Sequence, residues 1–344
     1  MTLAGPASTV VPLDDRSRVG EARRVAASLA ADAGLGESTR SDVGIVATEL
    51  ATNVLRHAER GTLLLRRLDG AGGGVELLCL DAGPGMRDPG ACMADGYSSA
   101  AGSMGTGLGA IRRLAHGFDL YSAAGRGTAV VARFWARREP GAVRDAGMLA
   151  GLAVAMPHET ECGDAWVARS GPAGTTVLLV DGLGHGPSAA AAAATAVEIF
   201  RAHPVAGPGE LVTLMHAGMR STRGAAVGVA GSGAHPADGV RFAGVGNVSA
   251  VLARTQDSRS LMSHNGTVGL QARKIQELHY PWPADAVLVM HSDGLQSHWR
   301  LDAYPGLAQR DAALIAGVLY RDSARGRDDV SVVVQRAGPP VPLG

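Results

Sequence analysis

Lysine is almost missing from this sequence. Lysine and arginine together number 32 among 344 residues, and Lys274 is the single lysine. A P-loop requires a lysine directly after its second glycine, and no Gly-Lys pair occurs in the chain. A Schiff-base mechanism would depend on Lys274, which lies in the polar stretch QARKIQE. If the protein binds a nucleotide, a site of another type must therefore hold it.

The chain also lacks an excess of either charge, with 32 basic and 32 acidic side chains. Nonspecific nucleic-acid binding needs a cationic surface, so the balance argues against that class. No apolar run approaches the ~20 residues of a membrane span, and the N-terminus shows no signal-peptide pattern. Cys79, Cys92 and Cys162 are odd in number and lack CxxC spacing, so we expect reduced thiols in a cytoplasmic protein.

Strand-like and helix-like stretches alternate on both sides of the aperiodic, charged segment ARREPGAVRDAG (136–147). This composition is typical of a linker. We therefore predict a domain over 1–138, a linker over 139–147 and a second domain over 148–338. The length fits two domains of about 100–200 residues each. Many short strands with inserted helices favour an α+β fold in which helices pack on antiparallel sheets.

Hydrophobic periodicity assigns the individual elements. Helices are expected at residues 16–33, 39–58, 107–115, in the alanine-rich stretch after 186, at 208–220 and at 307–320. Strands are expected at residues 62–68, 75–81, 118–124, 127–135, 152–156, 164–170, 175–181, 226–230, 240–245, 249–253, 286–293 and 330–336.

Three stretches of the first domain carry groups suited to a nucleotide. Glu49 and Asn53 are four residues apart and share a helix face, where they can hold Mg²⁺ and take a proton; an exposed polar pair fits the same spacing. Asp81 ends a strand before two glycines, so it can accept a hydrogen bond from an amino group while a flat ring approaches. A plain turn is the alternative. The stretch GSMGTGLGAIRRL (102–114) brings glycine N–H groups to a helix N-terminus, which suits a polyphosphate.

The order and spacing of these three stretches resemble the nucleotide-binding boxes of the GHKL ATPase family. Among its members, DAGPGM followed by DGYSSAAGSMGTGLGAIRRL is most similar to the RsbT-like switch serine kinases of the stressosome pathway. The resemblance implies an α/β sandwich of the Bergerat type that binds ATP with Mg²⁺. It also implies the following roles: Glu49 as general base for a substrate serine, Asn53 as Mg²⁺ ligand, Asp81 as partner of the adenine amino group, Gly83 and Gly85 in the adenine pocket, Gly105, Gly107 and Gly109 over the phosphates, and Thr128 near the adenine.

The second domain places aspartates at the ends of strands that are distant in sequence: Asp164, Asp181, Asp293, and Asp328 or Asp329. Asp-Gly after a strand can be a hairpin turn, but an alanine-rich helix rather than a strand follows Asp181. Each aspartate alone also fits a turn or cap. Grouped carboxylates repel one another unless cations neutralise them, and oxygen ligands favour Mg²⁺ or Mn²⁺ over Zn²⁺. Two such ions can generate a hydroxide that attacks a phosphoryl group.

The motifs VDGLGHG, GVGN, SDG and DDVSVVV resemble those of the metal-dependent PP2C phosphatases, and the SpoIIE/RsbX-type bacterial branch is the most similar. The resemblance implies an α/β/β/α sandwich with two Mn²⁺ or Mg²⁺ ions. It implies metal ligation by Asp164, Asp181, Asp293 and Asp328, with a contribution from the Gly182 carbonyl. Asp181 and Asp293 would also be essential to catalysis. Asp329 is the alternative to Asp328.

The two resemblances together predict a bifunctional regulator of bacterial stress signalling. One domain would phosphorylate, and the other dephosphorylate, STAS-domain partners of the anti-sigma antagonist or stressosome type. One alternative is a first domain that only binds nucleotide and sequesters a partner beside an active phosphatase. Another is a binding scaffold with two inactive sites. The sequence leaves the oligomeric state open.

Overall fold

The computed structural model describes residues 2–5, 7–69, 72–93, 107–137 and 147–341. Contacts group the chain into two compact units whose sequences interleave. The N-unit comprises Ser8–Gly147, Tyr304–Arg321 and Pro340–Gly344, and the C-unit comprises Met1–Ala7, Met148–Ala303 and Asp322–Pro339. The linear division expected from the sequence stays a prediction, and each unit is described below by itself.

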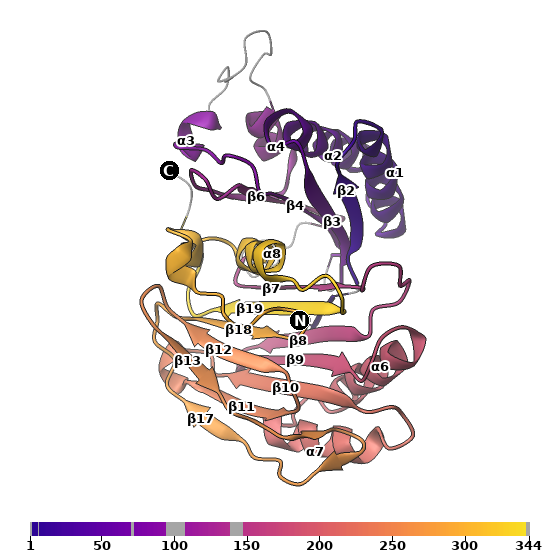
Figure 1. The fold of residues 1–344 in the computed structure, drawn as a ribbon, viewed down its shortest axis with the longest axis vertical. Helices are drawn as coiled ribbons and strands as arrows, with labels where there is room; N and C mark the ends of the chain where they lie inside the picture. The colour runs from indigo at the N-terminus through magenta and orange to yellow at the C-terminus, as the bar shows by residue number, and fades with distance from the viewer. Residues whose placement is uncertain (1, 6, 70–71, 94–106, 138–146, 342–344) are drawn as a thin grey trace. The chain divides into compact units, whose positions relative to one another are not determined.

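The N-unit is built on an antiparallel sheet of five strands in the order β2-β3-β4-β6-β5 (Figure 1). Helices α1 and α2 cover one face, where a hydrophobic core joins them to alternate strand residues such as Leu77 and Cys79 of β4. Pro12 in the edge strand β2 is tolerated because an edge strand leaves one row of N–H groups unpaired. The elements between residues 8 and 137 of this unit are β2 (Thr9–Leu13), α1 (Ser17–Asp32), α2 (Glu37–His57), β3 (Gly61–Leu68), β4 (Gly74–Asp81), α3 (Pro89–Cys92), α4 (Gly107–Leu114), β5 (Gly117–Ser122) and β6 (Thr128–Trp135).

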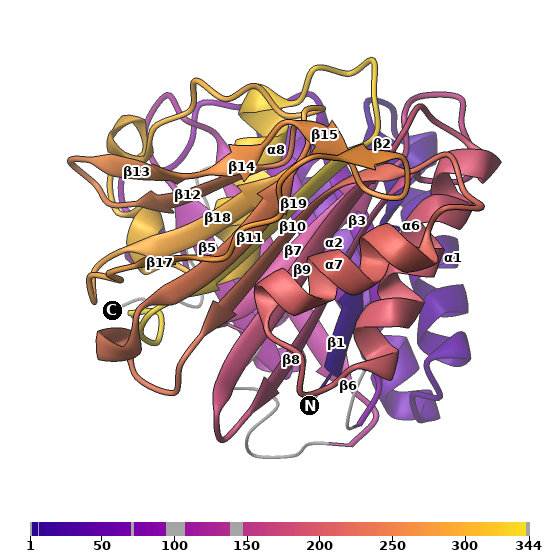
Figure 2. The same ribbon diagram turned by 90° about the horizontal axis from the view of Figure 1, so that it is seen from below.

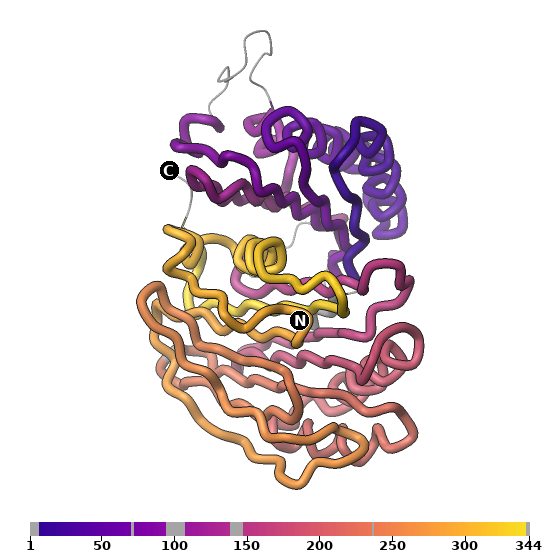
Figure 3. Tube along the Cα trace, in the orientation of Figure 1, coloured from indigo at the N-terminus to yellow at the C-terminus, as the bar shows by residue number. Residues whose placement is uncertain are grey.

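A helix from far along the chain contacts the other face of this sheet. Helix α8 (Ala312–Ser323) begins after the cap Asp311, whose Oδ1 accepts a hydrogen bond from Ala313 N at 2.9 Å. The missing side chain of Gly317 lets α8 approach closely, because a Cβ there would lie 2.9 Å from side-chain atoms of Leu78 and Leu80. The trace in Figure 3 shows the same proximity of the yellow helix to the sheet strands. β4 is therefore buried on both faces, as its nearly unbroken apolar run suggests.

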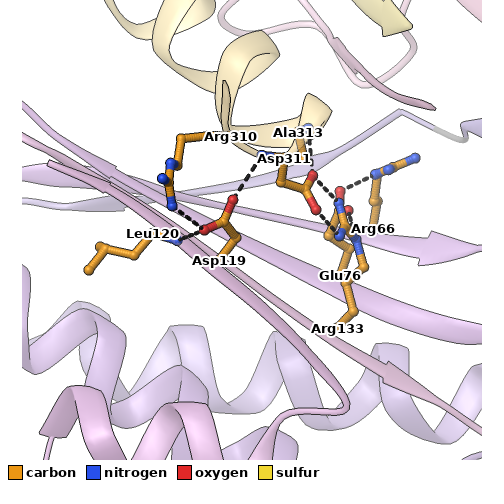
Figure 4. Close-up of polar contacts among 8 residues, drawn as sticks. All are labelled: Arg66, Glu76, Asp119, Leu120, Arg133, Arg310, Asp311 and Ala313. Atoms are coloured by element: carbon orange, nitrogen blue, oxygen red, sulfur yellow. Dashed lines mark hydrogen bonds and ion pairs between the residues drawn. The ribbon is translucent and has the colours of Figure 1, made fainter. Parts of the chain in front are cut away.

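The polar groups on this second face form a buried ion network (Figure 4). Glu76 accepts hydrogen bonds from Arg66 Nε at 2.7 Å and Arg133 Nε at 2.6 Å. The guanidinium of Arg133 also donates to both carboxylate oxygens of Asp311, at 2.6 and 2.8 Å. Burial alone would raise the pKa of Glu76, but the charges of Arg66 and Arg133 lower it to about 2. The network thus joins β3, β4 and β6 to the residue that caps α8.

In the described residues of the C-unit, two large sheets pack together and helices α6 and α7 cover one of them. A seven-stranded sheet has the order β1-β8-β9-β10-β11-β14 with β17 paired to β11, and a five-stranded sheet has the order β13-β12-β18-β19-β7. Apolar residues of both sheets form one core, and a second core lies between the seven-stranded sheet and helices α6 and α7 (Figure 2). A two-stranded ribbon, β15-β16, completes the unit.

The strands of the C-unit are β1 (Thr2–Gly5), β7 (Leu149–Val154), β8 (Asp164–Gly171), β9 (Gly174–Gly182), β10 (Ala225–Ser232), β11 (Val240–Val245), β12 (Ser249–Ala253), β13 (Ser258–Leu261), β14 (Ser263–His264), β15 (Gly266–Thr267), β16 (Gln271–Ala272), β17 (Leu278–Tyr280), β18 (Val287–His291) and β19 (Val330–Arg336). Its helices are α6 (Pro187–Ala202) and α7 (Pro208–Gly218).

The α+β fold expected from the sequence is confirmed, but several elements differ, among them the short helix α3 and the short strands β13 to β17, which the sequence pattern does not predict. The helix expected at 307–320 begins later, because a 3-10 turn over Leu307–Gln309 precedes the cap Asp311. The sequence pattern predicts no strand before residue 16, whereas β1 and β2 lie there and pair in different sheets. No helix within the described residues is long and apolar enough to cross a membrane.

The buried network predicts a large effect of Glu76→Gln on stability. The substitution leaves two buried guanidinium groups without their shared carboxylate, which should cost about 3–5 kcal/mol of unfolding free energy. Because the folded-state pKa of Glu76 lies below its ordinary value of 4.5, its contribution is present above about pH 4.5 and is lost as pH falls toward 2. Urea unfolding from pH 7 to pH 3 should show the parent losing more stability than the variant.

The matched control is Asp69→Asn, which removes an exposed partner 3.7 Å from Arg67 and should change stability by at most about 1 kcal/mol. Equal unfolding free energies for parent and Glu76→Gln would contradict the stabilising role of the network.

Candidate active sites

Helix α2 brings Glu49 and Asn53 to one place beside the start of α4. Leu50 and Val54, the residues after Glu49 and Asn53, belong to the core, whereas the polar pair is only partly buried. A Cβ added to Gly107 would lie 3.3 Å from both Nδ2 and Oδ1 of Asn53 and 3.5 Å from Glu49 Oε2. A carboxylate, an amide and the N-terminus of α4 therefore converge, and that combination suits a metal-bound phosphate group.

Asp81 ends β4 with its carboxylate held by backbone N–H groups. Its Oδ1 accepts hydrogen bonds from Gly83 N at 2.9 Å and from Thr128 N at 3.2 Å. Burial raises the pKa of Asp81, while these bonds and the charge of Arg321 act in the opposite direction. The Thr128 hydroxyl lies 3.0 Å from Ser122 Oγ. The carboxylate is thus fixed in orientation before any ligand is bound.

The two glycines after Asp81 are required by close approaches. A Cβ on Gly83 would lie 2.6 Å from the Ala58 side chain. Gly85 has a φ of +68°, and a Cβ there would lie 2.0 Å from the Ala123 carbonyl oxygen. The expected site residues of the N-unit therefore lie in the second half of α2, at the end of β4, at the start of β6 and at the start of α4, where Gly109 is also buried. Gly105 lies outside the described residues.

In the C-unit, Asp164 and Asp181 face each other across neighbouring strands, in register between β8 and β9. The Oδ2 atom of each is buried and has no hydrogen-bond partner. Burial and the charges of Asp293 and Asp328 raise the pKa of Asp181 to about 7. Burial and the neighbouring charge of Asp181 likewise raise the pKa of Asp164. The carboxylates lie close enough to oppose one another's ionisation, which is the situation that a cation relieves.

Asp328 and Asp329 have different surroundings. Asp329 is buried, and its two oxygens accept hydrogen bonds from Met156 N and Gly163 N, both at 2.8 Å. Asp328 is partly exposed and accepts a bond from Asp329 N at 2.9 Å. Both oxygens of Asp329 are thus engaged in holding the loop between β7 and β8. This difference favours Asp328 as the proposed ligand.

The alanines after Asp181 allow α6 to approach the end of β9. A Cβ on Gly182 would lie 2.4 Å from the backbone oxygen of Ala189. Four alanines of α6 are buried against the sheet: Ala189, Ala192, Ala193 and Ala196. Larger side chains on that face would push the helix away from the aspartate-bearing strand end.

Two further polar contacts were missed by sequence reasoning. Asn247 Nδ2 donates a hydrogen bond to Asp293 Oδ2, and the GVGN motif was the available signal for it. Glu159 Oε1 lies 2.7 Å from His185 Nδ1, and the preceding residue, His158, has a positive φ of 76°. Because Glu159 and His185 are 26 residues apart, their pairing has no local sequence signal. The other contact, from Asn247, orients the carboxylate of Asp293, a proposed metal ligand.

The donor set of the C-unit fits a hard divalent cation. Among the described residues, no three His, Cys, Asp or Glu side chains form a ready-made metal cluster. Mg²⁺, however, is usually held through one or two carboxylates and keeps several waters. The two buried, partnerless oxygens of Asp164 and Asp181 supply such carboxylates, and all the expected donors are oxygens. Magnesium or manganese fits these residues better than zinc does.

Comparisons with known proteins match two separate ranges of the chain, and each range contains residues of one of the two candidate sites. Residues 11–134 match the model of the histidine kinase-like ATPase domain, and residues 171–337 match that of stage II sporulation protein E (SpoIIE). Over 117 residues the chain is 32% identical to the serine/threonine-protein kinase RsbT of Bacillus subtilis (strain 168), covering 34% of this chain and 87% of RsbT. The chain belongs to the family of histidine kinase-like ATPases that includes RsbT. It joins this kinase-like ATPase domain to a SpoIIE-type, PP2C-like phosphatase domain.

Two solved structures are also similar. One, described as "The bacterial stressosome: a modular system that has been adapted to control secondary messenger signaling", is 26% identical, covers 55% of this chain and 98% of its own, and has a TM-score of 0.49. The other is a crystal structure of RsbX in complex with magnesium; it is 17% identical, covers 54% of this chain and 92% of its own, and has a TM-score of 0.48.

If Asp81 accepts a hydrogen bond from the adenine amino group, as the family resemblance implies, Asp81→Asn should weaken ATP binding. The amide presents an N–H₂ group or a weaker acceptor to the adenine amino group, and loss of a charge-assisted hydrogen bond corresponds to about a tenfold to hundredfold rise in Kd. Calorimetric titration with ATP–Mg²⁺ measures this change directly. Asp88→Asn is the control in the same unit, because Asp88 is exposed and caps α3. An unchanged Kd in Asp81→Asn would refute the adenine contact.

Proposed function

We propose that this protein is a bifunctional regulator with opposed activities. The N-unit phosphorylates a serine of a STAS-domain partner with ATP and Mg²⁺, and the C-unit hydrolyses phosphoserine or phosphothreonine with two divalent cations. Partners of the anti-sigma antagonist or stressosome type are proposed from the similarity to RsbT. The observation that carries the kinase half is the convergence of Glu49 and Asn53 on the start of α4.

In the proposed kinase reaction, Glu49 takes the proton of the attacking serine hydroxyl. Its Oε2 lies next to the N-terminus of α4, where N–H groups favour the negative charge of the transferred phosphoryl group. Asn53, one turn further along α2, holds Mg²⁺ through its side-chain oxygen. Asp81 orients the adenine, with its own carboxylate fixed by Gly83 and Thr128. Positioning and charge stabilisation supply most of the catalysis in phosphoryl transfer.

In the proposed phosphatase reaction, Asp164, Asp181, Asp293 and Asp328 hold the cations, with the Gly182 carbonyl as a further ligand. When bound, these ions supply an activated water and neutralise the phosphoryl oxygens. Asn247 keeps the Asp293 carboxylate in one orientation through its hydrogen bond. Asp329 fixes the loop between β7 and β8 through Met156 and Gly163. The chain thus provides ligands and their orientation, while no cysteine nucleophile is needed.

Two substitutions should separate the activities. Glu49→Ala removes the proton acceptor and should slow partner phosphorylation by ~10²–10⁴-fold while ATP still binds. Asp293→Asn should abolish dephosphorylation and let the phosphorylated partner accumulate. The measurement is partner phosphorylation against time by mass spectrometry, with a purified STAS-domain protein, ATP, Mg²⁺ and Mn²⁺. The parent should reach an intermediate level while it consumes ATP steadily.

Glu37→Ala, at the exposed start of α2, and Asp285→Asn, an exposed partner of Arg254, are the matched controls and should behave as the parent does. If Glu49→Ala phosphorylates the partner as fast as the parent, the kinase assignment is wrong. A nucleotide-binding domain that sequesters its partner would then replace it. Full phosphatase activity in excess EDTA would overturn the metal-dependent half.

A further inference from the structure

Arg223 is an exposed arginine of the C-unit, in the loop between α7 and β10. Within the described residues, its guanidinium takes part in no hydrogen bond or ion pair. Two other exposed arginines of the same unit do have acidic partners, because Arg241 pairs with Glu277 and Arg254 with Asp285. The donors of Arg223 are therefore available to an anionic ligand.

The backbone brings Arg223 beside the loop that follows Asp181. Strands β9 and β10 pair in antiparallel register up to Gly182. The next residue, Leu183, donates its backbone N–H to the oxygen of Gly224 at 3.0 Å. The pairing of the two segments thus continues beyond the ends of both strands and leads directly to Arg223.

The guanidinium of Arg223 lies against Gly184, three residues after Asp181. A Cβ added to Gly184 would be 3.0 Å from Nη2 of Arg223 and 3.3 Å from its Cζ. The carbonyl oxygen of Gly184 points to other backbone of the proposed metal site, because it would lie 3.4 Å from a Cβ on Gly163, the residue before Asp164. One glycine residue therefore separates the guanidinium from the backbone that leads into Asp164.

The charges of the proposed metal site leave a bound phosphoryl group only partly neutralised. The four proposed aspartate ligands and two divalent cations together carry no net charge, whereas a phosphoserine side chain adds about −1.5 to −2. The loop before Asp164, residues 155–163, contains no arginine or lysine. A guanidinium beside the site would supply positive charge, and its planar fork matches two phosphoryl oxygens.

We propose that Arg223 binds the phosphoryl group of the phosphatase substrate, with its guanidinium donating hydrogen bonds to phosphoryl oxygens. This inference rests on the proposed phosphatase function. Ala226 lies opposite Asp181 in the pairing of β10 with β9, and three residues of extended chain span at most about 11 Å. The extended side chains of an arginine and a phosphoserine can bridge that length together. Gly184 has no side chain that would obstruct the path of the guanidinium.

This contact has a consequence that does not depend on the rest of the substrate. Every phosphate monoester carries the same phosphoryl group, so a small ester and a phosphoprotein should both lose affinity when Arg223 is replaced. Inorganic phosphate, the product of hydrolysis, should lose affinity as well. Metal binding should be unaffected, because Arg223 is not among the proposed ligands.

The test measures hydrolysis of p-nitrophenyl phosphate by the full chain with saturating Mn²⁺, and its inhibition by inorganic phosphate. Arg223→Gln should raise both the KM and the inhibition constant of phosphate about tenfold to hundredfold, the effect of losing a charge-assisted hydrogen bond. The Mn²⁺ concentration for half-maximal rate should stay that of the parent. Arg223→Lys keeps the charge without the planar fork and should recover part of the loss.

Arg201→Gln is the matched control, because Arg201 is exposed in the last turn of α6. It lies 14 residues, or about 21 Å, from the first residue of that helix, and the variant should behave as the parent does.

Three outcomes would overturn the inference. If Arg223→Gln keeps the KM and the inhibition constant of the parent, Arg223 does not bind the phosphoryl group, and the proposed phosphatase function stands. If the Mn²⁺ requirement rises as much as the KM does, the substitution distorts the metal site, and the assignment to phosphate binding is wrong. No hydrolysis by the parent would overturn the phosphatase site and this inference together.

Discussion

The pairing of Arg133 with both Glu76 and Asp311 is the interaction on which the N-unit depends. Arg133 is 3% exposed, so its charge cannot be solvated by water and must be neutralised by protein groups. Glu76 belongs to the adjacent strand, whereas Asp311 comes from a segment 178 residues away. The positive charge of Arg133 is therefore neutralised partly by Glu76 of the sheet and partly by Asp311 of the distant segment. The ion network of the ATPase unit thus combines residues from both parts of the chain.

The segment that carries Asp311 also contacts the proposed nucleotide site, at the end of β4. Glu76, Leu78 and Leu80 face α8, and the strand then ends at Asp81, whose backbone oxygen accepts the hydrogen bond from Arg321. The distant segment is thus bound to the sheet at two places, through Asp311, which pairs with Arg133 of β6, and through Arg321, which bonds the end of β4. The orientation of the Asp81 carboxylate is set by local N–H groups, and the backbone oxygen of Asp81 accepts a hydrogen bond from Arg321 of α8. Local hydrogen bonds and a long-range contact therefore act on the same residue.

Sequence reasoning predicted features whose causes are local. Asp81 and Asp181 were placed at strand ends because an apolar run stops there before glycine, and Glu49 and Asn53 were placed on one face because helical geometry fixes four-residue spacing. The ion network had no such signal, since Arg66 and Glu76 within an apolar run read as ordinary strand residues. The Asp328 and Asp329 pair was also undecided, because two adjacent aspartates differ only in what each contacts. Helix α8 was expected as an element, but nothing in its sequence indicated which sheet it would cover.

Residues Tyr304–Arg321 group with the ATPase unit. Hydrogen exchange followed by mass spectrometry, comparing the parent with Glu76→Gln, tests it most directly. If Tyr304–Arg321 is a structural part of that unit, residues 312–319 of α8 lose protection together with residues 75–80 of β4 and to a similar extent, because the Arg133 guanidinium that pairs with Asp311 loses the Glu76 carboxylate that orients it. Loss of protection in 75–80 with unchanged exchange in 312–319 would contradict the account.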